Sequence, residues 1–236
     1  MNEKIQFTID PQGKWLYRVG GIAAIVLGIS YFVIIALYVP VGRPSGAEAW
    51  LKSLAEHSTR WAAIIGLDVL TDFLLVPVAL SFYLALKGIN KSVMLMATAF
   101  VGLFVILDLP LTWINIASLL ALGSHYAAAA NDAQREVIVT VAMYPSSIVE
   151  SNLTFVYNSL TLAVGILMTS LVMLKGIFNK ATAYVGVVTG VLGIVAVSSS
   201  FFASSVSNVS IILASLLTMV WALFAGFRLY QLSQHM

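Results

Sequence analysis

Residues 61–86 read WAAIIGLDVLTDFLLVPVALSFYLAL, and residues 92–122 read SVMLMATAFVGLFVILDLPLTWINIASLLAL. About 20 mostly apolar residues are enough to cross the hydrocarbon core of a bilayer as a helix, so each stretch predicts a membrane-spanning helix. Further stretches of the same kind are 19–40, 152–175, 183–204 and 209–228. The sequence therefore predicts an all-α integral membrane protein, a helical bundle of six spans.

The composition agrees with a membrane protein. Of the 236 residues, 60% are hydrophobic and only 9% are charged, against roughly 25% charged residues in a soluble domain. This excludes a soluble enzyme and a disordered chain. The net charge is +2 without a basic cluster, so we expect membrane lipid and no nucleic acid as partner. The chain has no cysteine, which excludes disulfides and thiolate metal sites, and we identify no cofactor beyond a bound cation.

Basic residues predict the orientation, because they are enriched in cytoplasmic loops. With six spans, eight of the named basic residues fall on one side and four on the other: Lys4, Lys14, Arg18, Lys87, Lys91, Lys175, Lys180 and Arg228 against Arg43, Lys52, Arg60 and Arg135. We therefore expect a protein of the cell membrane with a cytoplasmic N-terminal segment (1–18), one transmembrane domain (19–230) and a cytoplasmic tail (231–236).

Two connecting stretches are predicted to form helices on the outer side. Between the first two spans, Trp50, Leu51 and Leu54 recur at helical spacing among charged residues, which indicates a short interfacial helix or a loop helix that covers the bundle. Residues 131–150 are predicted to form another interfacial or re-entrant helix before the fourth long span. A seventh crossing within 131–150 is the alternative, but it divides the basic residues less cleanly.

Ionisable side chains within the spans are the unusual chemical feature. A carboxylate at the centre of a membrane helix costs about 2.5–3.5 kcal/mol on insertion scales, and residues 61–86 and 92–122 contain no Lys, Arg or His to pair with one. With both termini inside, Asp68 and Asp72 lie in the outer half of the membrane, Asp108 near the midplane and Glu150 near the outer edge, so we expect one pocket that opens to the outside. The predicted pocket comprises the acids Asp68, Asp72, Asp108 and Glu150 and the neutral ligands Asn115 and Asn158.

Three functions are compatible with this pocket. The favoured one is non-enzymatic: the acids bind a proton or a cation, with coupling to small-solute transport as a further hypothesis. The second is an intramembrane hydrolase acting on a lipid, in which His57 and His125 join Asp72 and Asp108 around a metal. The third is a structural or lipid-interacting protein, whose neutral acids hydrogen-bond between helices.

Small residues at helical spacing predict close helix packing. Gly20, Ala24 and Gly28 form one such stripe, and Gly186 and Gly190 belong to another. In lipid, small residues let two helix backbones approach. The stripes serve either packing within the chain or a homodimer.

Two segments carry a resemblance to a known family. Residues 126–136 read YAAAANDAQRE, and residues 167–195 read LMTSLVMLKGIFNKATAYVGVVTGVLGIV. In these segments and in the order of its spans, the chain resembles the prokaryotic multi-pass membrane proteins of the domain of unknown function 4386 family. The resemblance implies a bacterial or archaeal membrane protein, and it brings no activity and no catalytic residues.

Overall fold

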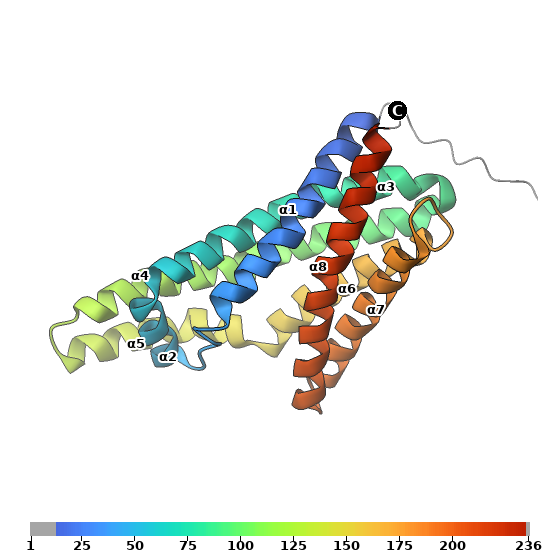
Figure 1. Cartoon of the computed structure of the whole chain (residues 1–236). Coiled ribbons are helices and arrows are strands. Elements are labelled where there is room, and N and C mark those ends of the chain that lie inside the picture. Colours follow the sequence, from blue (N-terminus) through green and yellow to red (C-terminus); the bar gives the residue numbers. More distant parts are fainter. Residues whose placement is uncertain (1–12, 235–236) are drawn as a thin grey trace, which may run out of the picture. The chain divides into compact units, whose positions relative to one another are not determined.

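The computed structural model describes residues 13–234, which are helical along almost their whole length and include no strand (Figure 1). The all-α prediction is thus confirmed. Most of the predicted N-terminal segment (1–18), with Lys4, and the last two residues of the tail (231–236) lie outside the described residues. The elements are α1 (Lys14–Tyr38), α2 (Ala47–Glu56), α3 (Ser58–Asp108), the π-helix η2 (Leu109–Trp113), α4 (Ile114–Ala128), α5 (Asp132–Glu150), α6 (Asn152–Met173), α7 (Lys180–Ser199) and α8 (Ser204–Gln234).

Among the described residues, five stretches of helix are long and apolar enough to cross a membrane: Lys14–Tyr38, Ser58–Ala128, Asp132–Met173, Lys180–Ser199 and Ser204–Gln234. The second of these has 71 residues and is interrupted at Asn90, whose φ of −154° and ψ of 92° are not helical. The side chain of Asn90 accepts a hydrogen bond from the backbone N–H of Val93 at 3.1 Å, which is how Asn caps the start of a helix. The break falls between the predicted spans 61–86 and 92–122.

The chain divides into two compact units. Unit 1 comprises residues up to Ile29, Phe73–Val105 and the residues from Ser159 onward, and unit 2 comprises Ser30–Asp72 and Ile106–Asn158.

In unit 1, the small residues bring helices of the same chain together. A Cβ atom added to Gly21 in α1 would lie 2.6 Å from the backbone nitrogen of Tyr230 in α8, and one added to Gly190 in α7 would lie 2.8 Å from the carbonyl oxygen of Ala163 in α6. Real Cβ contacts are not this short, so these glycines allow backbones to touch. Homodimer formation through such faces stays a prediction.

In unit 2, the core forms around α2. The side chains of Trp50, Leu51 and Leu54 are completely buried, and α2 packs against α4 and α5, as Figure 1 also shows. The indole of Trp50 lies 5.3 Å from that of Trp61, between ring centroids. The helix predicted between the first two spans thus exists, and its apolar face is covered by protein.

The predicted helix within 131–150 exists as well. It is α5, which runs from Asp132 to Glu150 and continues through Pro145. The helix therefore does not end at Tyr144, although the apolar run of the sequence is interrupted there by Pro-Ser-Ser.

Candidate functional site

Asp108 lies in unit 2 and is held by side chains of two helices. The indole Nε1 of Trp113 donates a hydrogen bond to its Oδ2 at 2.8 Å, and the amide of Asn158, from α6, donates to its Oδ1. The same amide reaches the hydroxyl of Thr112 at 2.9 Å, and the Thr112 side chain also hydrogen-bonds to Asp108. Asp108 is buried, with 7% of the residue's surface exposed, so its contacts are with protein.

The π-helix explains why Trp113 reaches Asp108. Pro110 has no backbone N–H, so the regular helical hydrogen bonds cannot continue through it. The chain instead forms the wider η2 turn, in which the N–H of Ile114 bonds to the carbonyl of Leu109 five residues earlier. In this wider turn the residue at i+5 comes round to the side of residue i. Both Thr112 and Trp113 therefore face Asp108.

Asn115 has a different role from the predicted one of neutral ligand. Its amide donates hydrogen bonds to the carbonyl oxygens of Pro110 and Leu111, each at 3.0 Å. These carbonyls belong to the distorted turn, so Asn115 satisfies backbone groups of its own helix. Regular helical spacing favoured Asn115 beside Asp108, but the π-turn puts Trp113 there.

Asp68 and Asp72 lie on α3 and are also buried, at 8% and 2% exposure. Each has one buried oxygen, Oδ2, that accepts no hydrogen bond within residues 13–234. Both are close enough to Asp108 for the three charges to interact. The structure thus brings together four of the predicted site residues: Asp68, Asp72, Asp108 and Asn158.

Sequence reasoning missed Tyr31 of α1 as a member of this group. Its phenol hydrogen-bonds to the side chain of Thr71 and lies within electrostatic range of Asp68, Asp72 and Asp108. No local pattern around Tyr31 indicates this position, because it depends on how α1 packs. For Trp113 the sequence does contain a signal, because Pro110 lies between Asp108 and Trp113 and interrupts the regular helical spacing there. We refer to Tyr31, Asp68, Asp72, Asp108 and Asn158 as the acid cluster.

The carboxylate of Glu150 accepts hydrogen bonds at the start of α2. Its Oε1 accepts hydrogen bonds from the backbone N–H of Gly46 at 2.8 Å and from the indole of Trp50 at 2.9 Å. Gly46 is the residue at the start of α2 and has no side chain to cap it, so Glu150 supplies the acidic cap that a helix N-terminus favours. The guanidinium of Arg43, in the loop before α2, donates a hydrogen bond to the carbonyl oxygen of Val149 at 3.4 Å.

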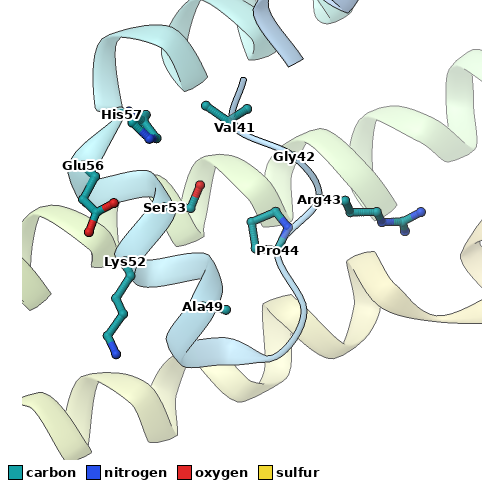
Figure 2. Close-up of a pocket in the computed structure, with 9 residues that line it drawn as sticks. All are labelled: Val41, Gly42, Arg43, Pro44, Ala49, Lys52, Ser53, Glu56 and His57. Atoms are coloured by element: carbon teal, nitrogen blue, oxygen red, sulfur yellow. The ribbon is translucent and has the colours of Figure 1, made fainter. Parts of the chain in front are cut away.

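The two candidate histidines occupy separate settings. His57 terminates α2 and lines an open pocket beside that helix (Figure 2), whereas His125 is exposed in the last turn of α4. In the part of the chain that the structure describes, no three His, Asp or Glu side chains lie in an arrangement that could hold a metal ion.

The Glu150→Ala variant is expected to loosen α2. Loss of a helix-capping side chain costs about 1–2 kcal/mol, and here the indole N–H of Trp50 also loses its acceptor. We expect a lower melting temperature in detergent and faster amide hydrogen exchange in 47–56. Glu136→Ala is the matched control, because Glu136 is an exposed acid of α5. Equal exchange in the two variants would contradict the capping role.

The comparisons with known proteins identify a family. No curated protein and no solved structure matches the chain. A family model matches residues 19–228, which run from α1 into α8 and include the whole acid cluster. The match covers well over half of the chain and agrees with the resemblance seen in the sequence, so the chain belongs to the family described as Domain of unknown function (DUF4386).

Proposed function

We propose that this membrane protein carries an intramembrane proton-binding site at the acid cluster. The observation that carries the proposal is the pair of buried carboxyl oxygens, Oδ2 of Asp68 and Oδ2 of Asp72, that accept no hydrogen bond from any residue between 13 and 234. A buried polar atom without a partner is costly. A bound proton turns one carboxyl oxygen into a donor and removes the charge that makes burial so unfavourable.

The three acids have different roles in this proposal. Asp108 receives hydrogen bonds from Trp113, Asn158 and Thr112, and a carboxylate, which only accepts, suits such a set of donors. Asp108 therefore carries the fixed negative charge. Asp68 and Asp72 receive no such set of donors from the described residues, and the Oδ2 atom of each accepts no hydrogen bond from them, so these two acids take up and release protons. A small monovalent cation is the alternative occupant, since no basic residue lies within 61–86 or 92–122.

With six spans, the acid cluster would lie in the outer half of the membrane. As one straight helix, the 71 residues of Ser58–Ala128 would be roughly 100 Å long at 1.5 Å per residue. That is about three times the hydrocarbon thickness. We therefore assign one crossing to each side of the break at Asn90. With α1, α6, α7 and α8 this makes six crossings, and α2 and α5 lie outside.

The orientation follows from the basic residues, with both termini cytoplasmic. The chain then leaves the membrane after α1 and re-enters with α3. Asp68 and Asp72 lie within the first four turns of α3, and Asn158 within the first two turns of α6. These positions belong to the outer half of each crossing, so the cluster exchanges protons with the outside.

Infrared spectroscopy tests the proton site. Exposed carboxyl groups are ionised near pH 7, so a protonated carboxyl C=O band at that pH reports buried neutral acids. We expect the band in the wild-type protein, a weaker band in Asp68→Asn and in Asp72→Asn, and its loss in the double variant. Glu136→Gln serves as the control and should retain the full band.

Two results would contradict this assignment. If the band is absent and sodium raises the melting temperature of the wild-type protein but not of Asp72→Asn, the site binds a cation. If the band is absent and sodium has no effect, the acids are ionised in a hydrated cavity and the cluster is not a binding site.

Transport is the second part of the proposal. Intramembrane acids mark proton and ion pathways, and a carrier needs a group that binds and releases its coupling ion. In proteoliposomes containing a pH-sensitive dye, an external acid pulse should acidify the lumen when the protein is present. Asp72→Asn should abolish this flux, whereas Glu136→Gln should not. Equal flux through both variants would exclude a role of Asp72 in proton movement.

A further inference from the structure

A polar pocket lies in unit 2, between α2 and the loop that follows α1. It is open to the surface and has a volume of about 420 Å³, which is within the range of small-molecule sites. Figure 2 shows Ser53 and His57 on the side of α2 that faces Val41 and Pro44 of the loop. Positive φ angles at Gly42 and Gly46, 65° and 82°, let the loop turn here.

Three polar groups of the pocket are available to a ligand. The hydroxyl oxygen of Ser53 accepts a hydrogen bond from the indole of Trp61 at 3.1 Å, which leaves its O–H free to donate. Glu56 and His57 also line the pocket. Neither side chain makes a hydrogen bond or ion pair in the described part of the chain, although the charge of Lys52 acts on Glu56. A carboxylate binds cationic donors, while a hydroxyl and an imidazole N–H bind anionic oxygens.

The two permanently charged basic residues of the pocket are already engaged. Lys52 pairs with Glu48 at 2.7 Å, and Arg43 donates to the carbonyl of Val149. They lie at opposite sides of the pocket (Figure 2), where they contribute positive potential. The walls between them include the apolar side chains of Val41, Pro44 and Ala49.

We infer that this pocket binds a small zwitterion, a molecule with an ammonium group and an anionic oxygen group a few bonds apart. Glu56 binds the ammonium group, and Ser53 and His57 bind the anionic oxygens. An ordinary anion leaves Glu56 without a partner, and an ordinary cation leaves Ser53 and His57 without one. This chemistry occurs both in soluble zwitterions and in the phosphoethanolamine headgroup of a lipid.

Tryptophan fluorescence of the full-length protein in detergent tests the inference, because Trp61 hydrogen-bonds to Ser53. We expect phosphoethanolamine to cause a saturable change. Glu56→Gln and His57→Ala should each weaken binding about tenfold, because the first loses the charge that binds the ammonium group and the second loses one hydrogen bond to a charged oxygen. Glu136→Gln should bind like the wild-type protein. Ethanolamine and inorganic phosphate, which each supply half of the ligand, should bind at least about tenfold more weakly than phosphoethanolamine.

A second arm distinguishes the two sources of the ligand. The same titration is made in nanodiscs of phosphatidylglycerol with and without phosphatidylethanolamine. If the lipid headgroup occupies the pocket, phosphatidylethanolamine will reduce the apparent affinity for the soluble probe. If a soluble zwitterion is the ligand, the lipid will have no effect.

The inference is overturned if phosphoethanolamine causes no saturable change, or if the double variant Glu56→Gln/His57→Ala binds like the wild-type protein. Inorganic phosphate binding as tightly as phosphoethanolamine would overturn it as well. Both substituted residues are at the surface, so circular dichroism and the melting temperature should stay unchanged. The acid cluster takes no part in this test, so its outcome is independent of the proton site.

Discussion

Replacing Asp108 with Asn is expected to destabilise the protein by about 3 kcal/mol, the cost of losing a charge-assisted hydrogen bond and leaving a buried donor unpaired. Trp113 and Asn158 donate to different oxygens of this carboxyl group. An Asn side chain has one oxygen and one NH₂ group, so it accepts only one of these hydrogen bonds. The other N–H then faces the new NH₂ group, and turning the new amide by 180° only moves the conflict to the other donor.

The matched control is Asp72→Asn, the same substitution at a carboxyl group that is more deeply buried. Asp72 is 2% exposed and its Oδ2 accepts no hydrogen bond, so the substitution removes a buried acid without orphaning a donor at that oxygen. We expect its free energy of unfolding to stay within about 1 kcal/mol of the wild-type value or to rise. Thermal unfolding in detergent measures both variants. Equal destabilisation by the two substitutions would rule out different roles for the two acids.

Gly21→Ala in unit 1 is expected to have the second large effect. The added methyl group would lie 2.6 Å from the backbone nitrogen of Tyr230 and 2.9 Å from the carbonyl oxygen of Gly226. Backbone atoms cannot rotate away as a flexible side chain can, so α1 and α8 must separate at this crossing. Overpacking of this kind costs about 1–3 kcal/mol, and we expect a correspondingly lower melting temperature.

Gly102→Ala is the control variant, and we expect it to have the opposite effect on stability. Gly102 lies within α3, and a Cβ atom added there would meet nothing within 4 Å. Alanine is a better helix former than glycine by about 1 kcal/mol, so this variant should match the wild-type protein or exceed it in stability. A melting temperature that changes in the same direction for both variants would contradict the proposed close approach of α1 and α8.

The sequence was sufficient to predict the helices because their signal is local. Runs of apolar residues predicted the membrane class, the helix between residues 61 and 86, and the boundary that the structure realises as the break at Asn90. The family was also predictable, from segments such as 167–195. The four-residue spacing of Asp68 and Asp72 was enough to put both on one helix face.

The contacts of two predicted site residues, Asn115 and Glu150, could not be predicted from the sequence. Asn115 was assigned to the face of Asp108 by regular helical spacing, but Pro110 prevents regular spacing there. Glu150 was grouped with the acids because it is acidic and lies near the start of a predicted span. In the structure it caps α2, which is about 100 residues earlier in the chain. No local pattern encodes such a contact.

Composition and periodicity by themselves determined that this chain forms apolar helices that contain buried acids, because both follow from the solubility of each side chain and from its spacing along one helix. Only the tertiary structure decided which acid receives hydrogen bonds and which are left without them. Donors come from other turns and other helices, as Asn158 comes from α6, and their positions depend on how the helices pack.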